Sequence, residues 1–359
     1  MHTEAPAALP PSALAAQPEV LVIGAGPVGL FTVFQLGLQG LRAHLVDALP
    51  HTGGQCAELY GDKPIYDVPG VPVCTGRELV ALLERQIAPM APVRHLGRRV
   101  EALSPCETEG RAWQARLDDG TALVARAVVI AAGVGAFVPR TLKIEGIDTL
   151  PPGLLHYHDA PVPPGTAVVV HGGDDPAVLR ALTLAADPGH PPVVLLHRRD
   201  MFQAPSEALA ALSAARAAGR IRVQVGQPLR IAAQGDAAVL TVLDTEGQEQ
   251  TLPLGRLEVR LGLSPRLGPI ADWGIALERK QLVVDTARFA TSAPGVYAVG
   301  DINTYPGKRK LILCGFHEAT LAAFAVAERL SGAPVALQYT TTSPRLHQRL
   351  GVAPSAAAD

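Results

Sequence analysis

The chain has 359 residues, a length more typical of two domains than of one. Its formal net charge of −2 gives no reason to expect a nucleic-acid partner, and no apolar run reaches the roughly 20 residues that a membrane-spanning helix needs. The first eighteen residues lack the basic start and apolar stretch of a secretory signal. We therefore expect a flexible N-terminal tail (1–18) on a cytoplasmic protein.

The first element in the chain is a nucleotide-binding pattern. A strand is predicted over Val20–Ile23, then a G-x-G-x-x-G turn, then a helix through Gln39. In such a turn Gly24 permits the sharp bend, Gly26 lets the backbone approach a pyrophosphate, and Gly29 lets helix and strand pack closely. The N–H groups that begin the helix would face the phosphates.

A second strand is predicted over Leu41–Val46 and ends at Asp47, about twenty residues beyond the glycines. A carboxylate at that point can accept hydrogen bonds from ribose hydroxyl groups. The alternative is a structural glycine turn with a solvated aspartate. The strand, the helix and the acid together favour the dinucleotide site.

The middle of the chain combines helical, antiparallel and proline-rich segments. Apolar spacing predicts a helix over Leu79–Gln86, and residues 98–126 alternate like a small antiparallel meander with a turn at 118–120. A buried strand is predicted over Val128–Ala132. The proline-rich residues 151–164 are typical of a linker.

A second glycine turn follows this linker. The strand predicted over Ala167–Val170 leads into Gly172 and Gly173, and a later strand, predicted at 193–196, is followed by Arg198 and Arg199. Two guanidinium groups after such a strand suit a 2′-phosphate, which favours NADP over NAD.

Near the C-terminal end, a short strand predicted at 295–299 ends in Gly300 and Asp301. A carboxylate at that position can bind the ribityl chain of a flavin. A helix is predicted over Gly315–Leu330. These features together indicate an FAD site shared by both ends of the chain.

Three segments, GAGPVGLFTVFQLGLQG, GGQCAELYGDKPIYDVPG and AVGDINTYPGKRKLILCGFHEA, closely resemble the thioredoxin-reductase-like (type 2) ferredoxin/flavodoxin–NADP reductase family. The resemblance extends from about residue 19 to the C-terminal YTTTS. It implies an α/β fold of two Rossmann-like, three-layer domains, the second inserted into the first. The FAD-binding domain would comprise residues 19–150 and 270–345, the NADP-binding domain 151–269, and a C-terminal tail 346–359.

The resemblance also implies roles for individual residues. Besides the glycines, Asp47 and Asp301, it assigns the following to the FAD site: Gln55, Tyr60, Val100, Phe137 and Thr342. Tyr60 would stack on the flavin, and Tyr339, on an extension from the partner of a homodimer, would cover its other face. The resemblance also places the start of the helix Gly315–Leu330 at the edge of the flavin ring, where its positive end, and His317 if protonated, would stabilise negative charge on the reduced ring. No side chain is expected to act as a catalytic nucleophile, and no metal site is expected. Electrons would pass between NADPH and ferredoxin or flavodoxin.

Two departures from the family pattern leave an alternative open. Asp174 stands where the second turn should have its third glycine, and Gln203 stands where an arginine is expected. The added bulk and negative charge oppose pyrophosphate binding. A flavoprotein with a degenerate NADPH site, fed by ferredoxin or acting as a flavin-binding regulatory module, is therefore the alternative. Lys308–Lys310 or Arg98–Arg99 could form a basic rim for an acidic ferredoxin.

The four cysteines form no CxxC pair, so the sequence lacks the dithiol of a thioredoxin reductase. Bacillithiol-disulfide reductases share the fold without a CxxC but place a cysteine inside the first glycine turn, where this chain has Val28. Cys56 could substitute for it only as a reactive thiol. We therefore expect electrons to leave the flavin directly, which its chemistry allows.

Overall fold

The computed structural model describes residues 18–106 and 112–352, including all their side chains except those of Phe137, Val138, Leu263 and Pro265. These residues form two compact units. The first contains the described residues up to Ala136 and from Arg266 onward, and the second is Phe137–Pro265. The chain passes between the units through β10 (Ala136–Pro139) and β19 (Leu263–Arg266), which pair with each other.

The first unit is built on a five-stranded parallel sheet of order β22-β9-β1-β2-β5. In chain order its strands are β1 (Val20–Ile23), β2 (Ala43–Asp47), β5 (Val93–Leu96), β9 (Ala127–Ile130) and β22 (Val296–Ala298). The central strands consist of β-branched and leucine side chains buried on both faces, as expected for a sheet covered on both sides.

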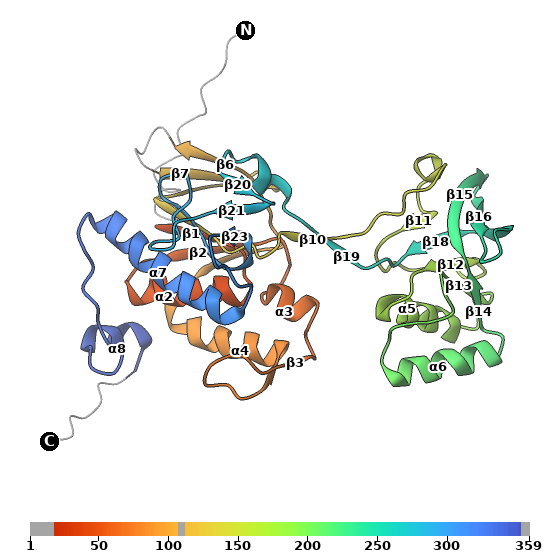
Figure 1. Ribbon diagram of the computed structural model, residues 1–359, viewed down its shortest axis with the longest axis horizontal. Helices are drawn as coiled ribbons and strands as arrows, with labels where there is room; N and C mark the ends of the chain where they lie inside the picture. Colours follow the sequence, from red (N-terminus) through yellow and green to blue (C-terminus); the bar gives the residue numbers. More distant parts are fainter. Residues whose placement is uncertain (1–17, 107–111, 353–359) are drawn as a thin grey trace, which may run out of the picture. The chain divides into compact units, whose positions relative to one another are not determined.

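Helices cover one face of this sheet. They are α2 (Pro27–Leu38), α4 (Gly76–Ile87) and α7 (Ile312–Ser331), and α2 lies beside α7 (Figure 1). The short helices of this unit are α3 (Gly54–Glu58) and α8 (Pro344–Leu350). Two-residue strands β3 (Pro64–Ile65) and β4 (Cys74–Thr75) form a hairpin before α4. Thr75 caps α4 in a capping box with Glu78.

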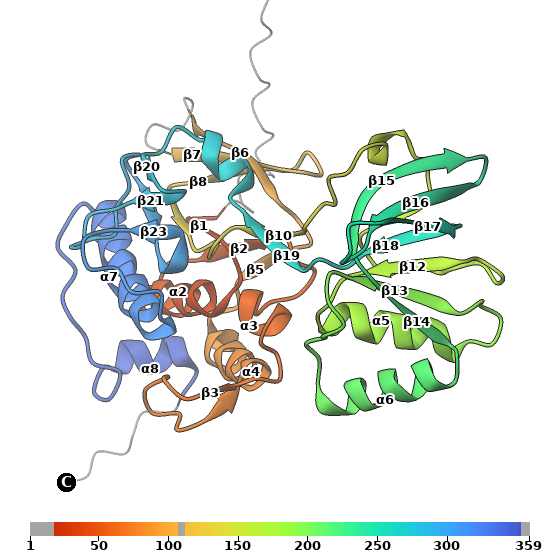
Figure 2. The same cartoon turned by 45° about the vertical axis from the view of Figure 1, so that its right-hand side comes forward.

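Antiparallel strands cover the other face. The predicted meander is confirmed as β6 (Val100–Cys106), β7 (Ala112–Leu117) and β8 (Ala122–Ala125), with the turn at 118–120. Near it lie the strands β20 (Leu277–Glu278), β21 (Gln281–Val283) and β23 (Asn303–Thr304), as both views show (Figures 1 and 2). A single apolar core joins the three layers of the unit.

The second unit repeats this plan with a parallel sheet of order β11-β18-β12-β13-β14. Its strands are β11 (Leu155–His156), β12 (Val168–His171), β13 (Val193–His197), β14 (Ile221–Val225) and β18 (Arg256–Val259). One face carries α5 (Asp175–Ala186) and α6 (Ser206–Ala217). The other face carries the antiparallel sheet of β15 (Gln227–Gln234), β16 (Ala237–Leu243) and β17 (Glu249–Leu254) (Figure 2).

Side-chain alternation along β12 divides this unit into two cores. Val168 and Val170 pack toward α5 and α6, whereas Val169 packs toward the antiparallel sheet. The predicted α/β class with two Rossmann-like domains, the second inserted into the first, is thus confirmed by the topology.

The boundaries differ from those expected. The units change at 136/137 and 265/266 rather than at 150/151 and 269/270. The proline-rich range 151–164 is not a linker, because Leu154 is buried and Leu155–His156 forms β11 of the second unit. Residues 344–350, partly expected in the C-terminal tail, form α8, which Ser343 caps and Leu346 anchors as a buried side chain.

Candidate functional site

The first glycine turn has three glycines that each meet a different need. Gly24 has φ +109°, and a β carbon there would overlap the carbonyl of Ala131. A β carbon at Gly29 would overlap the carbonyl oxygen of Gly24, so the start of α2 lies directly on the turn. A β carbon at Gly26 would have no neighbouring atom closer than 3.9 Å. The backbone is therefore accessible at Gly26, as a pyrophosphate cradle requires.

The N-terminal end of α2 is free of competing acids. Gly26 is its N-cap, Pro27 begins its first turn, and no side chain caps the helix. The first N–H groups of a helix carry a partial positive charge, and an anionic phosphate can satisfy them. The turn thus fits the diphosphate of a dinucleotide.

Asp47 ends β2 beside this turn. Its Oδ2 accepts a hydrogen bond from the Ala25 amide at 2.6 Å, and its Oδ1 accepts one from the Leu49 amide at 2.8 Å. Burial raises the pKa of Asp47, and the two backbone bonds partly offset that rise. The carboxylate therefore holds the glycine turn in place and keeps lone pairs for a further donor such as a ribose hydroxyl.

The C-terminal half of the site meets the first half at Val28. Gly300, which follows β22 with φ +79°, would place a β carbon 3.4 Å from Val28. A β carbon at Gly315, in α7, would overlap Cγ2 of the same valine. The structure therefore brings the Gly300–Asp301 turn together with the first turn of α2, which lies within the G-x-G-x-x-G pattern.

Gln55 and Tyr60 lie at the rim of this region. The Gln55 amide nitrogen lies 3.0 Å from where a β carbon at Gly133 would be, next to the end of β9. The Tyr60 ring is 44% exposed, and the Lys63 ammonium lies 5.3 Å from its centroid. A partly exposed aromatic ring of this kind can stack on another ring.

The other residues expected to contact FAD lie in separate segments of the chain. Val100 is buried at the start of β6, opposite Leu117. Thr342 and Tyr339 lie in the exposed segment between α7 and α8, where the Thr342 amide donates to the Tyr339 carbonyl. The side chain of Phe137 lies outside the described part of the structure.

The start of α7 and the surroundings of Lys308 differ from what the sequence predicted. The helix α7 begins at Ile312, three residues before Gly315, so His317 lies in its second turn, edge-on to the ring of Phe289. Lys308 is no part of an exposed basic rim, because its ammonium is buried against Glu318 at 2.5 Å. Arg98 and Arg99 are exposed but paired with acidic side chains.

Glu318 is the polar residue of this region that the sequence interpretation missed. It is wholly buried in α7, and its Oε2 accepts a hydrogen bond from the Gly300 amide at 2.7 Å. The signal was its place in the sequence: a carboxylate in the first half of a mostly apolar helix, whose other carboxylate, Glu328, lies near the C-terminal end.

The second glycine turn joins β12 to α5. A β carbon at Gly172 would overlap the carbonyl oxygen of Arg260, and one at Gly173 would overlap the His197 ring. Both glycines are thus required by packing in the chain itself. Arg198 and Arg199 directly follow β13 and are exposed.

Asp174 forms the third position of this turn with extended backbone angles (φ −107°, ψ −179°). Its Oδ1 is buried and has no hydrogen-bond partner among the described residues, and its carboxylate does not cap α5. Burial raises its pKa. The backbone of Gln203 pairs with the same turn, its amide donating to the Gly173 carbonyl at 2.9 Å.

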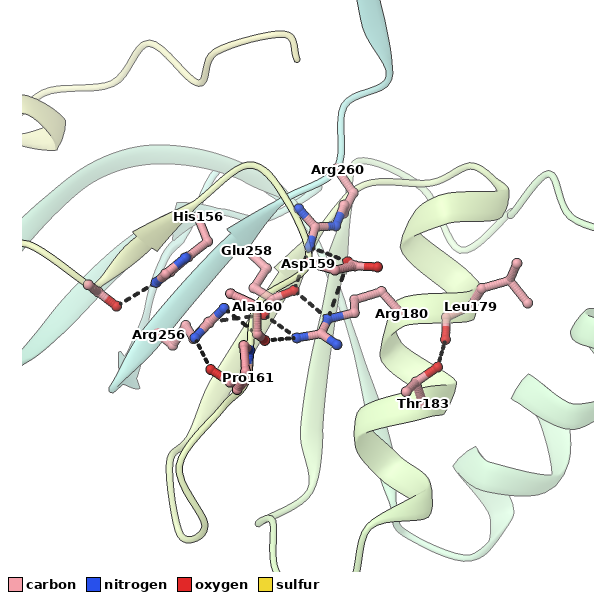
Figure 3. A network of polar contacts seen from close by, with 11 residues as sticks. His156, Asp159, Ala160, Pro161, Leu179, Arg180, Thr183, Arg256, Glu258 and Arg260 are labelled. Atoms are coloured by element: carbon pink, nitrogen blue, oxygen red, sulfur yellow. Dashed lines mark hydrogen bonds and ion pairs between the residues drawn. The ribbon is translucent and has the colours of Figure 1, made fainter. Parts of the chain in front are cut away.

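A cluster of charges on β18 was also missed. Arg256 and Glu258 of β18, and Arg260 directly after the strand, occupy alternate positions and face α5, where the neighbouring strands present valine and leucine (Figure 3). The wholly buried Glu258 accepts two hydrogen bonds from Arg180 of α5, at 2.7 and 2.8 Å, and one from Arg260 at 2.8 Å.

This charged row fixes the connection from β11 to β12, which crosses the sheet face without a helix. Arg180 and Arg256 donate to the carbonyls of Ala160 and Pro161, and Arg260 binds Asp159 at 2.7 Å (Figure 3). Because this connection contains no helix, its carbonyls lack helical hydrogen bonds, and the arginines donate to them instead. Their function is therefore to hold the edge of the second sheet.

The four cysteines, all within the described residues, form no disulfide bond. Burial, together with the nearby Cys74 and Asp301, raises the pKa of Cys56 to about 11. A thiol of this kind is almost wholly protonated at neutral pH and is a poor nucleophile. Among the described residues, no helix is long and apolar enough to span a membrane, and no three His, Cys, Asp or Glu side chains are grouped as metal ligands would be.

The sequence profile of the pyridine nucleotide-disulphide oxidoreductases matches residues 18–328. Curated relatives include the ferredoxin–NADP reductases of Paracidovorax citrulli (62% identical; 93% of this chain and 96% of that protein covered) and Verminephrobacter eiseniae (57% identical; 95% and 98% covered). This chain belongs to the ferredoxin–NADP reductase family. It is an oxidoreductase enzyme, as the sequence interpretation predicted.

Solved structures with the same fold include the thioredoxin reductase of Lactococcus lactis (22% identical, TM-score 0.54, 88% of this chain and 100% of that one covered). The bacillithiol disulfide reductase of Staphylococcus aureus is also similar in fold (16% identical, TM-score 0.58, 86% and 97% covered). At such identities the likeness concerns the two-domain fold alone. The predicted resemblance to the thioredoxin-reductase-like type is confirmed at that level.

Proposed function

We propose that this enzyme holds FAD in its first unit and transfers electrons between NADPH and a one-electron carrier, ferredoxin or flavodoxin. The observation that carries the proposal is the meeting of both halves of a dinucleotide site at Val28, which touches Gly300 and Gly315. The curated relatives named ferredoxin–NADP reductase support the same reaction.

The residues of the first unit fit FAD. The open backbone at Gly26 and the uncapped start of α2 suit its diphosphate, Asp47 suits the adenosine ribose, and Asp301 suits the ribityl chain. Gln55 and the exposed Tyr60 would line the ring. Bound FAD supplies an acceptor for a two-electron hydride and a donor of single electrons.

The second unit would bind NADPH through Gly172, Gly173 and the exposed Arg198 and Arg199. Guanidinium groups pair with the 2′-phosphate that distinguishes NADPH from NADH. The side chains of this chain then orient the reactants, and none needs to act as a covalent nucleophile.

Tyr339 and Thr342 support a homodimer, and we propose that it works in the cytoplasm. Tyr339 is 65% exposed on the segment that follows α7, with its ring open for contact. In a dimer this segment would cover the flavin of the partner subunit, with Thr342 at the polar edge of the ring. Val100 and Phe137 would contact FAD from the same unit.

A second candidate function rests on Asp174. Its buried, unpartnered oxygen lies in the turn where a pyrophosphate would approach, and like charges repel there. The enzyme could then receive electrons from reduced ferredoxin without binding NADPH. A bacillithiol-type thiol mechanism is disfavoured because Val28 replaces the turn cysteine and the Cys56 pKa is raised.

Steady-state reduction of a purified bacterial ferredoxin, and separately of a flavodoxin, tests the proposal. With the FAD content per chain measured first, NADPH should drive reduction of at least one carrier, and NADH much more slowly. A yellow protein that reduces neither carrier with NADPH, yet is itself reduced by prereduced ferredoxin, would favour the second candidate. A protein that neither contains nor takes up FAD would refute both.

A further inference from the structure

The backbone N–H and C=O groups of Gly300 are both held by one buried ion pair. Its N–H donates to Glu318 Oε2 at 2.7 Å, and its carbonyl accepts from the Lys308 ammonium at 2.8 Å. The same ammonium binds Glu318 Oε1 at 2.5 Å. Glu318 is fully buried, and the Lys308 side chain is 8% exposed.

Further donors complete the shell of the Glu318 carboxylate. The Asn303 amide donates to Oε2 at 2.9 Å and to the Ala298 carbonyl at 2.8 Å. The Tyr305 hydroxyl donates to Oε1 at 2.9 Å. Each carboxylate oxygen therefore accepts two hydrogen bonds, and the buried charge has a full set of partners.

The far side of the turn is fixed independently. The Gln281 side-chain amide donates to the carbonyls of Asp301 and Asn303, at 3.1 and 2.8 Å. Residues 298–303 are thus held from several elements: α7, β21 and the segment before α7. The backbone of Asp301 is oriented by these contacts before any ligand binds.

A buried ion pair is weak evidence for stability as such, because well-packed apolar residues often serve as well. What a network around a fully paired carboxylate does provide is one defined backbone arrangement, although Asn303 Oδ1 has no hydrogen-bond partner among the described residues. Here that arrangement is the left-handed conformation of Gly300, φ +79°, and the direction in which the next residue, Asp301, leaves the turn.

We propose that Glu318 is a positioning residue for FAD binding, acting through Gly300 and Lys308 to orient Asp301. This inference rests on the proposed FAD site. It predicts that FAD affinity depends on the acceptor that Glu318 presents to the Gly300 amide, beyond any effect on overall stability.

The test compares two double variants, Lys308→Met/Glu318→Gln and Lys308→Met/Glu318→Leu. Both remove the buried charges and keep similar side-chain volumes, but only glutamine leaves an oxygen to accept from Gly300 and Asn303. The Kd of each apoprotein for FAD would be measured by quenching of flavin fluorescence, alongside its Tm. We expect the leucine variant to bind FAD about 10- to 100-fold more weakly than the glutamine variant.

Equal Kd values for the two variants would overturn the inference, provided both fold. Hydrogen exchange of the wild-type apoprotein gives a test that needs no variant. The Gly300 amide should be strongly protected without FAD, and exchange as fast as in an open loop would also overturn it. If the wild-type chain binds no FAD at all, the proposed function fails instead, so the two failures are distinguishable.

Discussion

Val28 and Gly315 lie in such close contact that a β carbon on the glycine would overlap Cγ2 of the valine. The contact joins the first turn of α2 to the first turn of α7, which is where the two halves of the proposed FAD site meet. The packing of Val28 against Gly315 therefore sets the distance between the two halves of the proposed site.

Substitution of Gly315→Ala should separate α2 from α7 and weaken FAD binding. Overpacking of this kind costs about 1–3 kcal/mol. The compensating double variant Val28→Ala/Gly315→Ala restores the space and should recover most of the loss. FAD Kd and Tm of the two variants provide the measurement, and an alanine at 315 that changes neither value would contradict the contact.

The sequence was sufficient to predict the first glycine turn because its glycines are required by backbone geometry. A β carbon at Gly29 would overlap the Gly24 carbonyl, and this restriction depends only on residues close together in the sequence. The sequence could not reveal the role of Glu318, because its hydrogen-bond partners lie up to 18 residues away and meet it only in the folded unit. The same holds for Glu258, since nothing near it in sequence identifies Arg180 as its partner. The start of α7 was misplaced by three residues because Leu311–Leu313 resembles an apolar strand as readily as a helix.

Asp174 should oppose both stability and NADPH binding. Its raised pKa means that the ionised form is disfavoured in the folded state, so Asp174 destabilises the fold above that pKa. Below the ordinary aspartate pKa of about 4, both states are protonated and the cost vanishes. Asp174→Asn should therefore raise Tm at pH 7, and the gain should shrink as the pH falls toward 4.

The same variant should lower the Kd for NADPH, because it removes a negative charge beside the expected pyrophosphate. Asp174→Gly is the matched variant that removes bulk as well, and the extended backbone at this position tolerates both residues. Titration calorimetry with NADPH distinguishes charge from bulk. Unchanged affinity in both variants would show that Asp174 does not face the nucleotide.

Arg198 and Arg199 should set the preference for NADPH. Replacing both with alanine should reduce kcat/KM for NADPH by about 10- to 100-fold, the loss expected for charge-assisted pairs, and leave NADH almost unaffected. Arg216→Ala is a control in the same unit, since that arginine pairs with Asp200 on the surface. Equal losses with both nucleotides would argue against recognition of the 2′-phosphate.

Cys56 should be slow to alkylate. With a pKa of about 11, about one thiol in a thousand is ionised at pH 8. Mass spectrometry after iodoacetamide treatment should find Cys106 and Cys314, which are partly exposed, modified well before Cys56. Rapid labelling of Cys56 that also abolishes activity would revive a thiol mechanism.

The most direct test of the proposed electron transfer is anaerobic mixing of the purified, FAD-loaded protein with NADPH while the flavin absorbance is followed. We predict rapid bleaching with NADPH and much slower bleaching with NADH. A flavin that dithionite bleaches but NADPH leaves oxidised would contradict the proposal and indicate that the second nucleotide site no longer functions.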